Sequence, residues 1–362
     1  MHLLMKKPFQ TIILTAILAV AAGGSHAELM VGDKAPALQT GKWVQGEPVQ
    51  SFETNHVYIV EFWATWCGPC VASIPHLNQL WEKFKDKGVM VIGQDVWDGD
   101  PAVAPFVKRM GTNMTYRVAL DDKSQEADGW MAEHWWPRSV NHHGIPHAFV
   151  INRDGMIAWI GHPMQLNEQV LDDIVSGHQD LAKAAAEYKT QWQLNQKFLE
   201  TQQELYSALN NKKWDDAKTA LDQMASAFPD TEDDYANVRL KILLGQGKFD
   251  EAWQIAGAAS EAHATNDFWQ NELAWTIVTA DTANDQCLVL AETMAERAVQ
   301  LTKGQNAGAI DTLARAQFVL GKKQEAIATE EKAVNLESNP QEKVLLEKTL
   351  ASYQAGTLPK AE

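Results

Sequence analysis

The sequence predicts a mixed α/β unit followed by an all-helical unit, and three observations support this fold class. Between about residues 57 and 160, short apolar runs rich in β-branched residues alternate with stretches of helical periodicity. After about Gly177 the strand-like runs disappear, and Ala, Glu, Gln, Leu and Lys dominate. A chain of 362 residues is also too long for one ordinary hydrophobic core. We therefore expect at least two domains, the first with a mixed sheet covered by helices.

The α/β unit is expected to alternate strands and helices and to end with a hairpin and a last helix. The predicted strands are 57–62, 89–93, 116–120, 147–151 and 156–160, and the predicted helices are 69–85, 103–110, 124–135 and 167–176. Apolar residues recur near 3.6 spacing in helix 69–85, which is typical of a helix with one buried face. Asp154-Gly155, between the last two strands, predicts a tight hairpin turn.

The helical half contains similar segments at a spacing of roughly 35 residues. KKWDDAKTAL, GKFDEAWQIA and GKKQEAIATE begin at residues 212, 247 and 321, and they place Ala at 217, 252 and 326. Such self-similarity is typical of stacked helix hairpins, in which small residues let helices approach closely. The segments resemble degenerate tetratricopeptide repeats over about residues 210–355. A generic helical bundle is the alternative.

The first 27 residues have the pattern of a cleavable signal peptide. Lys6 and Lys7 precede an apolar run at 12–22, and Ser25-His26-Ala27 provides small residues for cleavage. The run of 11 residues is shorter than the roughly 20 that a membrane-spanning helix needs. We expect a periplasmic or secreted protein without stable membrane insertion. An uncleaved N-terminal anchor is the alternative.

The charge balance of the chain excludes nucleic acid as an expected partner. The formal net charge is −16 at pH 7, and loss of Lys6 and Lys7 with the signal peptide makes the mature chain more acidic still. An acidic surface without a basic run repels nucleic acid and anionic lipid.

Two of the three cysteines, Cys67 and Cys70, lie at the predicted start of helix 69–85, directly after a buried strand. Unpaired backbone N–H groups and the helix dipole favour a thiolate there, so Cys67 is the expected nucleophile and Cys70 the resolving thiol. A metal site would need further ligands, and no second Cys-X-X-Cys pair exists. A purely structural disulfide is the other alternative, although so short a loop constrains the unfolded chain little. Cys287 is expected to be a small buried helical residue, or else to form an intermolecular disulfide.

The segment VEFWATWCGPC, at 60–70, resembles the active-site segment of the thioredoxin superfamily. Together with GIPHAFVINRDGMIAWIG, at 144–161, it is similar to the exported TlpA/redoxin branch of thioredoxin-like disulfide reductases. The resemblance covers roughly residues 30–180 and implies an α/β thioredoxin-like fold. The expected order is a signal peptide at 1–27, a thioredoxin-like domain at 28–180, a linker helix at 181–210 and a tetratricopeptide-like all-helical domain at 211–356.

The resemblance also implies the roles of the catalytic residues. Cys67 would be the attacking thiol and Cys70 the resolving thiol of a redox-active disulfide. Glu61 falls where thioredoxins place a buried acid, which would take and return the proton of Cys70. A solvent-facing position in the strand is the alternative for Glu61. We expect no metal and no cofactor at this site.

The substrate-docking surface is likewise implied by the resemblance. Pro146, after Ile145, occupies the position of the family's cis-proline, which lies against the disulfide while the preceding backbone pairs with the substrate chain. Trp66, Gly68 and Pro69 would flank the cysteines in this surface, and plain packing is the alternative for Trp66. Many reductases of this branch carry Arg and Glu where this chain has Val71 and Ser73, which leaves the client preference open.

The segment GWMAEHWWPRSVNHHG, at 129–144, contains three Trp and three His just before Ile145. It is expected to form an aromatic lip beside the active site. A copper or zinc site that uses His134, His142, His143 and Met131 is a weaker alternative, because these residues lack recognisable ligand spacing.

These observations favour an exported thiol-disulfide oxidoreductase that reduces disulfides in exported partner proteins. An unidentified electron-donor protein would re-reduce it, and the helical repeats would recruit a protein or peptide ligand. A repeat-based scaffold or chaperone-like protein with an accessory redox domain is the main alternative. Thiol peroxidase activity is a weaker one, because the Cys pair has the Trp-Cys-Gly-Pro-Cys context of thioredoxins.

Overall fold

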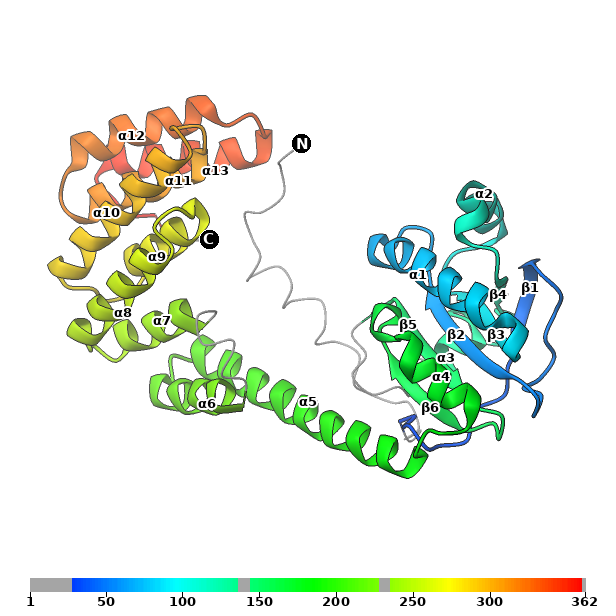
Figure 1. Cartoon of the computed structure of the whole chain (residues 1–362). Helices are drawn as coiled ribbons and strands as arrows, with labels where there is room; N and C mark the ends of the chain where they lie inside the picture. Colours follow the sequence, from blue (N-terminus) through cyan, green and yellow to red (C-terminus); the bar gives the residue numbers. More distant parts are fainter. Residues whose placement is uncertain (1–27, 136–143, 228–234, 360–362) are drawn as a thin grey trace. The chain divides into compact units, whose positions relative to one another are not determined.

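The computed structural model describes residues 28–135, 144–227 and 235–359 (Figure 1). By its internal contacts the chain divides into two units, between Gln196 and Lys197. The first unit holds a mixed six-stranded sheet with helices, and the described part of the second is built of helices. The predicted fold class, α/β followed by all-α, is confirmed. The predicted signal peptide lies outside the described residues.

Strand β2 is one of the two central strands of the sheet and carries the acid expected in the active site. The strand order is β1-β4-β3-β2-β5-β6. Strands β2 (Val57–Trp63), β3 (Val89–Asp95) and β4 (Arg117–Asp121) are parallel, whereas β1 (Thr40–Gln45), β5 (His147–Ile151) and β6 (Ile157–Gly161) pair antiparallel with their neighbours. Every residue of β2 is buried. A strand buried on both faces is a continuous apolar run in the sequence, which explains why β2 was predictable.

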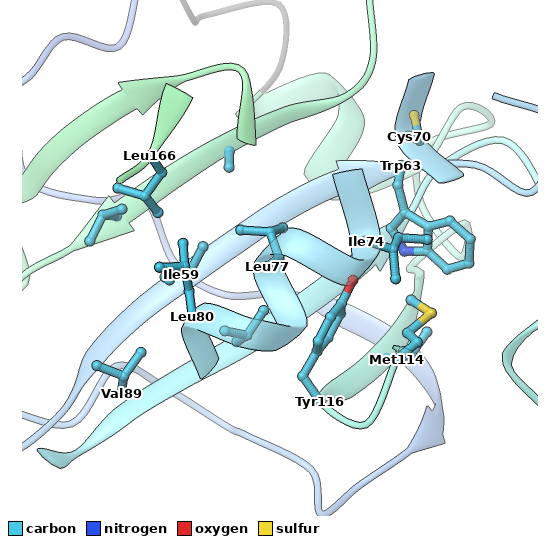
Figure 2. Packing of buried hydrophobic residues seen from close by; sticks show 14 of the residues in the cluster. Ile59, Trp63, Cys70, Ile74, Leu77, Leu80, Val89, Met114, Tyr116 and Leu166 are labelled. Carbon is cyan, nitrogen blue, oxygen red and sulfur yellow. The ribbon is translucent and has the colours of Figure 1, made fainter. Parts of the chain in front are cut away.

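The two faces of the sheet carry separate hydrophobic clusters. Helices α1 (Gly68–Phe84), α2 (Asp100–Met110) and α4 (Glu168–Ser176) pack with Ile59 on one face, in the cluster that also contains both active-site cysteines (Figure 2). On the other face, α3 (Trp130–His134), residues 29–38 and the first turns of α5 (Leu181–Asn210) pack with Tyr58. The alternation of side chains along β2 divides its residues between the two clusters. Short 3-10 turns occur at Lys85–Lys87, Gly111–Asn113 and Pro163–Gln165.

Two differences from the predicted elements have identifiable causes. Strand β1 was not predicted, because it lies at the sheet edge and none of its residues is fully buried. The helix predicted at 124–135 is wrong over its first half, and only α3 is helical. Gly129 has φ +106°, outside the helical region, and the carboxylate of Asp121 accepts the first amides of α3. The helix therefore begins where the sheet supplies a cap.

The second unit is a series of helices in which consecutive helices pack against one another. After α5 the chain forms α6 (Trp214–Ala227), α7 (Ala236–Gly245), α8 (Phe249–Ala262), α9 (Asp267–Val278), α10 (Asp285–Leu301), α11 (Ala307–Val319), α12 (Lys323–Leu336) and α13 (Pro340–Ala355). Helices α9, α10, α11 and α13 each begin after an Asn whose side chain accepts a backbone N–H of the first turn. None of the described helices is long and apolar enough to cross a membrane.

The repeated alanines occupy equivalent places in this unit. Ala217, Ala252 and Ala326 are each the fourth residue of a helix, and none of them has exposed surface. Cys287 lies 35 residues after Ala252, near the start of α10, and is equally buried. The prediction of Cys287 as a small buried helical residue is therefore confirmed; it is the third residue of α10, whereas the alanines are each the fourth residue of their helices. The likeness to tetratricopeptide repeats stays a prediction.

Candidate active site

Cys67 and Cys70 form a disulfide at the start of α1, with an S–S distance of 2.04 Å. Cys67 is the residue that caps the helix, and its Sγ accepts the backbone N–H of Cys70 over 3.2 Å. Cys67 has 5% of its surface exposed and Cys70 none. The N-terminal N–H groups and dipole of α1 thus face the sulfur of Cys67, where they stabilise negative charge. Cys67 is the more accessible sulfur and the better placed nucleophile.

A cis peptide bond joins Ile145 to Pro146. The carbonyl oxygen of Ile145 lies 3.5 Å from Sγ of Cys67. Pro146 is buried, Ile145 is half-buried, and β5 begins at the next residue. The Cys pair and the Ile145-Pro146 motif, nearly 80 residues apart in the sequence, therefore meet at Sγ of Cys67, as the resemblance implied.

Three of the predicted docking residues surround Cys67 at the surface. Trp66, Gly68 and Pro69 are exposed, and Trp66 keeps 64% of its surface accessible. Trp66 is therefore not a core residue, and its place in a docking surface stays a prediction. The ring of Trp66 stacks on Trp97, a residue that the sequence did not point to, with ring centroids 6.1 Å apart.

Glu61 lies on β2 with no exposed surface, so the alternative of a solvent-facing residue is wrong. The hydroxyl of Tyr116 donates to Oε2 over 3.0 Å, and Oγ of Ser73 lies 3.4 Å from Oε1. Burial raises the pKa of Glu61 to about 8, and the two hydrogen bonds reduce the effect. Burial and the neighbouring Glu61 also raise the pKa of Tyr116 well above its ordinary value. A carboxyl that titrates near neutral pH is suited to exchange protons with a thiol.

Ser73 connects Glu61 to the turn that contains Cys70. Its hydroxyl donates to the carbonyl oxygen of Cys70 over 2.9 Å. A hydroxyl has one hydrogen, so a protonated Glu61 can donate to the free lone pairs of Ser73. The sequence marked Ser73 only as a departure from related reductases. The structure shows that it lies between Glu61 and Cys70.

Two residues of the alternative metal site have other partners. Met131 is fully buried, and its sulfur accepts the backbone N–H of Gln39 over 3.4 Å. The ring of His134 stacks on Trp130 and contacts the carbonyl oxygen of that residue. His142 and His143 lie outside the described residues. Over the part of the chain that the structure describes, no three His, Cys, Asp or Glu side chains are grouped to hold a metal ion.

Comparisons with known proteins match the first unit. Residues 31–160 match the model of the AhpC/TSA family. The chain is 30% identical over 155 residues to thiol-disulfide oxidoreductase ResA of Bacillus thuringiensis (strain Al Hakam), covering 40% of this chain and 82% of ResA. It is 28% identical over 218 residues to Protein FixW of Rhizobium leguminosarum, covering 57% of this chain and 94% of FixW. A solved thiol:disulfide interchange protein of the thioredoxin family from Chlorobium tepidum TLS is 26% identical, covers 40% of this chain and 94% of that one, and has a TM-score of 0.33.

Proposed function

Because this chain belongs to the family of thiol-disulfide oxidoreductases that includes ResA, we propose that it is exported and reduces disulfides in partner proteins. The observation that carries the proposal is the Cys67–Cys70 disulfide at the start of α1, beside the carbonyl of Ile145 and linked through Ser73 to a buried acid. The described form, with its disulfide, is the state that one such turnover would leave. An electron-donor protein would restore the dithiol.

The first step is attack by the Cys67 thiolate on a client disulfide. A bond forms between Sγ of Cys67 and one client sulfur, the client S–S bond breaks, and the other client sulfur leaves as a thiolate that takes a proton from solvent. The N-terminus of α1 stabilises the attacking thiolate. Trp66, Gly68 and Pro69 surround the sulfur and would contact the client chain, and Ile145 offers its backbone beside it.

The second step releases the reduced client. Cys70 loses its proton, attacks Sγ of Cys67 and re-forms the enzyme disulfide, while the second client sulfur leaves and is protonated. Two electrons and two protons have then passed to the client. Glu61 in its ionised form would accept the proton of Cys70, with Ser73 between the two residues. The raised pKa of Glu61, about 8, keeps its affinity for a proton close to that of a thiol.

Insulin reduction with dithiothreitol as electron source tests the redox activity. The mature full-length chain is expected to precipitate the insulin B chain, whereas Cys67→Ser is expected to do so only at the background rate of dithiothreitol. Cys70→Ser should accumulate a mixed disulfide with insulin that is visible on a non-reducing gel. Cys287→Ala is a matched control, since it removes the third cysteine, which is buried in α10, and leaves Cys67 and Cys70 unchanged. Equal activity of wild type and Cys67→Ser would refute the proposal.

Export is supported by the charged, apolar and small-residue pattern of residues 1–27. Expression of the full chain in a bacterium, followed by periplasmic fractionation and N-terminal sequencing, tests it. A mature protein in the periplasm that begins near Glu28 is expected. A full-length chain that stays with the membrane would indicate the uncleaved anchor instead.

The helical unit would recruit a protein or peptide partner. This part of the proposal rests on the repeated segments with buried alanines and on Trp253 and Phe268, which keep 39% of their surface each. The alternatives to a redox enzyme can be tested directly. Cells that lack this protein should lose a function that the wild-type chain restores and the Cys67→Ser, Cys70→Ser double variant does not. Restoration of that function by the double variant would favour the scaffold alternative.

The peroxidase alternative makes a different prediction. Consumption of hydrogen peroxide by the protein that depends on Cys67 would favour it.

A further inference from the structure

The segment Val96–Asp98, which follows β3, lies against the turn that carries Cys67. The backbone N–H of Val96 donates to the carbonyl oxygen of Trp63 over 3.0 Å. The Trp97 ring stacks on Trp66 at an interplanar angle of 19°. Val96 and Trp97 therefore both contact residues next to the turn that carries Cys67.

Asp98 makes the shortest of these contacts. Its Oδ2 accepts the backbone N–H of Thr65 over 2.6 Å, two residues before Cys67. Trp97 has φ +70°, in the left-handed region that favours glycine. A side chain as large as tryptophan takes that conformation only when its neighbours hold it there. The hydrogen bond of Val96 to Trp63, the contact of Asp98 with Thr65 and the ring stack of Trp97 on Trp66 all help to hold this segment.

Asp98 is in turn held by Asp95, the last residue of β3. Asp95 has 1% of its surface exposed, and its Oδ2 is buried with no donor group in reach. Besides burial, the charge of Asp98 and a hydrogen bond between the two side chains raise the pKa of Asp95. Two ionised carboxylates are both acceptors and repel each other, so the contact is stable only with a proton between them.

The surrounding charges assign that proton to Asp95. Asp98 has the Thr65 amide as a donor, and Nζ of Lys123 donates to its carbonyl oxygen over 3.1 Å. Burial raises the pKa of Asp95 to about 9, with further contributions from Asp98 and Asp121, and Lys123 acts in the opposite direction. The carboxyl of Asp121 already has three backbone N–H donors at 2.8 Å, from Asp122, Met131 and Ala132. Asp121 therefore has its own hydrogen-bond donors and does not compete for the proton that Asp95 and Asp98 share.

We propose that Asp95 is a positioning residue for the redox reaction. Its proton bonds Asp98, and Asp98 holds the Thr65 amide and so fixes the turn that presents Cys67. This role rests on the proposed function, because it concerns the reactivity of the same sulfur. Ionisation of Asp95 would place two carboxylates in contact and weaken the hold on Thr65. The reactivity of Cys67 then depends on a proton that lies on neither cysteine nor on Glu61.

Three variants of the full chain separate this role from simple packing. In Asp95→Asn the amide supplies a permanent hydrogen to Asp98. Asp95→Leu has a similar size but no hydrogen to donate. Asp86→Asn, in the 3-10 turn at the far end of α1, is the control for loss of an acidic side chain. Thermal unfolding of each variant reports whether it is folded at the temperature of measurement.

The first measurement is the alkylation rate of Cys67 by iodoacetamide at pH 7, together with the thiol-disulfide equilibrium against glutathione. Asp95→Leu is expected to alkylate at least threefold more slowly than wild type and to shift the equilibrium constant by a similar factor. Asp95→Asn and Asp86→Asn should remain within twofold of wild type. Wild-type values in Asp95→Leu, or equal losses in Asp95→Leu and Asp95→Asn, would overturn the proposal.

The second measurement uses the oxidised protein, in which neither active-site cysteine titrates, so it does not depend on turnover. Near-UV circular dichroism of the Trp66–Trp97 stack should change between pH 7.5 and 10 in wild type, with a midpoint near 9. Trp97→Phe identifies the part of the spectrum that belongs to the stack. Asp95→Asn should lack this transition even if Asp95→Leu does not fold. A transition of wild-type size in Asp95→Asn refutes the positioning role, whereas absent insulin reduction in wild type refutes the proposed function.

Discussion

The hydroxyl of Tyr116 reaches the carboxylate of Glu61 across an intervening strand. Tyr116 directly precedes β4 and Glu61 lies on β2, with β3 between them. Gly93 of β3 is the register partner of Glu61. A Cβ atom at Gly93 would lie 3.1 Å from both the Tyr116 ring and Nε1 of Trp63. The missing side chain therefore leaves the space in which Tyr116 and Trp63 pack in the same cluster as α1 (Figure 2).

Removal of the Tyr116 hydroxyl should make Glu61 a weaker acid. The hydrogen bond from Tyr116 lowers the pKa of Glu61 against the larger effect of burial. A hydrogen bond to a charged group contributes about 1.5–3 kcal/mol, and 1.36 kcal/mol corresponds to one pH unit. In Tyr116→Phe the midpoint for titration of Glu61 should rise by at least about one pH unit. Carboxyl ¹³C NMR of the oxidised protein measures the midpoint.

Tyr58→Phe is the matched control for this change. Tyr58 is also buried, but it lies on the opposite face of β2, and its hydroxyl accepts the backbone N–H of Glu53. Loss of that hydroxyl should leave the titration of Glu61 unchanged. A Glu61 midpoint that does not move in Tyr116→Phe, or that moves equally in Tyr58→Phe, contradicts the assigned hydrogen bond.

The buried acid should also make the protein less stable as the pH rises. The pKa of Glu61 is 4.5 in its ordinary environment and about 8 in the fold. Between these values the unfolded chain releases a proton that the native state keeps, so stability is greatest below the ordinary pKa and falls until the pH passes 8. The loss at pH 7 is about 3 kcal/mol. Glu61→Gln carries a neutral amide at every pH and should remove this loss.

Chemical denaturation at pH 5 and pH 8 measures this effect. Glu61→Gln should gain stability over wild type at pH 8 and much less at pH 5, while its release of reduced insulin slows because the amide accepts no proton from Cys70. Ser73→Ala is the companion variant, because it breaks the contact between the acid and the Cys70 turn. An equal stability difference at both pH values would show that Glu61 is not neutral in the fold.

The parts of the site that could be predicted from the sequence are those that are contiguous in it. The buried run of β2, the helix that starts at the Cys pair and the hairpin at Asp154-Gly155 each carry a local pattern. The cis bond before Pro146 was implied only by resemblance to a family, because an X-Pro sequence does not specify its isomer.

The supporting residues could not be predicted because they act through contacts between distant strands. Tyr116 and Glu61 are 55 residues apart, and Thr65 and Asp98 are 33 apart. Nothing in the local sequence of Asp95 distinguishes it from a surface acid at the end of a strand. In the helical half, by contrast, the place of Cys287 could have been found, since it follows Ala252 by the same 35 residues that separate Ala217 from Ala252.

Replacement of a glycine by alanine should change the stability of the helical unit in opposite directions at Gly245 and at Gly257. A Cβ atom at Gly245, the last residue of α7, would lie 2.2 Å from the indole of Trp214 at the start of α6. Gly257 lies within α8, and no atom lies within 4 Å of its Cβ position. Gly245→Ala should cost about 1–3 kcal/mol by overpacking, whereas Gly257→Ala should stabilise by about 0.5–1 kcal/mol through helix propensity. Thermal unfolding measures both, and a stabilising Gly245→Ala would contradict the packing of Trp214.

The close approach of Gly129 to Asp121 should make the start of α3 intolerant of any side chain. Gly129 has φ +106°, and a Cβ there would lie 2.3 Å from Oδ2 of Asp121. Gly155, in the β5–β6 turn, also has a positive φ, of +75°, but open space around its Cβ position. Gly155→Ala should therefore lower the free energy of unfolding by about 1–2 kcal/mol, through backbone strain alone. Gly129→Ala should lower it by at least twice as much, because the steric clash with Asp121 adds to the strain.

A double-mutant cycle separates the clash from the strain. Asp121→Ala removes the carboxylate that accepts the amides of Met131 and Ala132, and should itself destabilise by about 1–3 kcal/mol. In the Gly129→Ala, Asp121→Ala double variant the steric contact is absent. The double variant should therefore lose less free energy of unfolding than the two single variants lose together. Denaturant unfolding of the four proteins supplies the cycle. Strict additivity would mean that the Gly129 backbone does not pack against the carboxylate, and that α3 begins at residue 130 for backbone reasons alone.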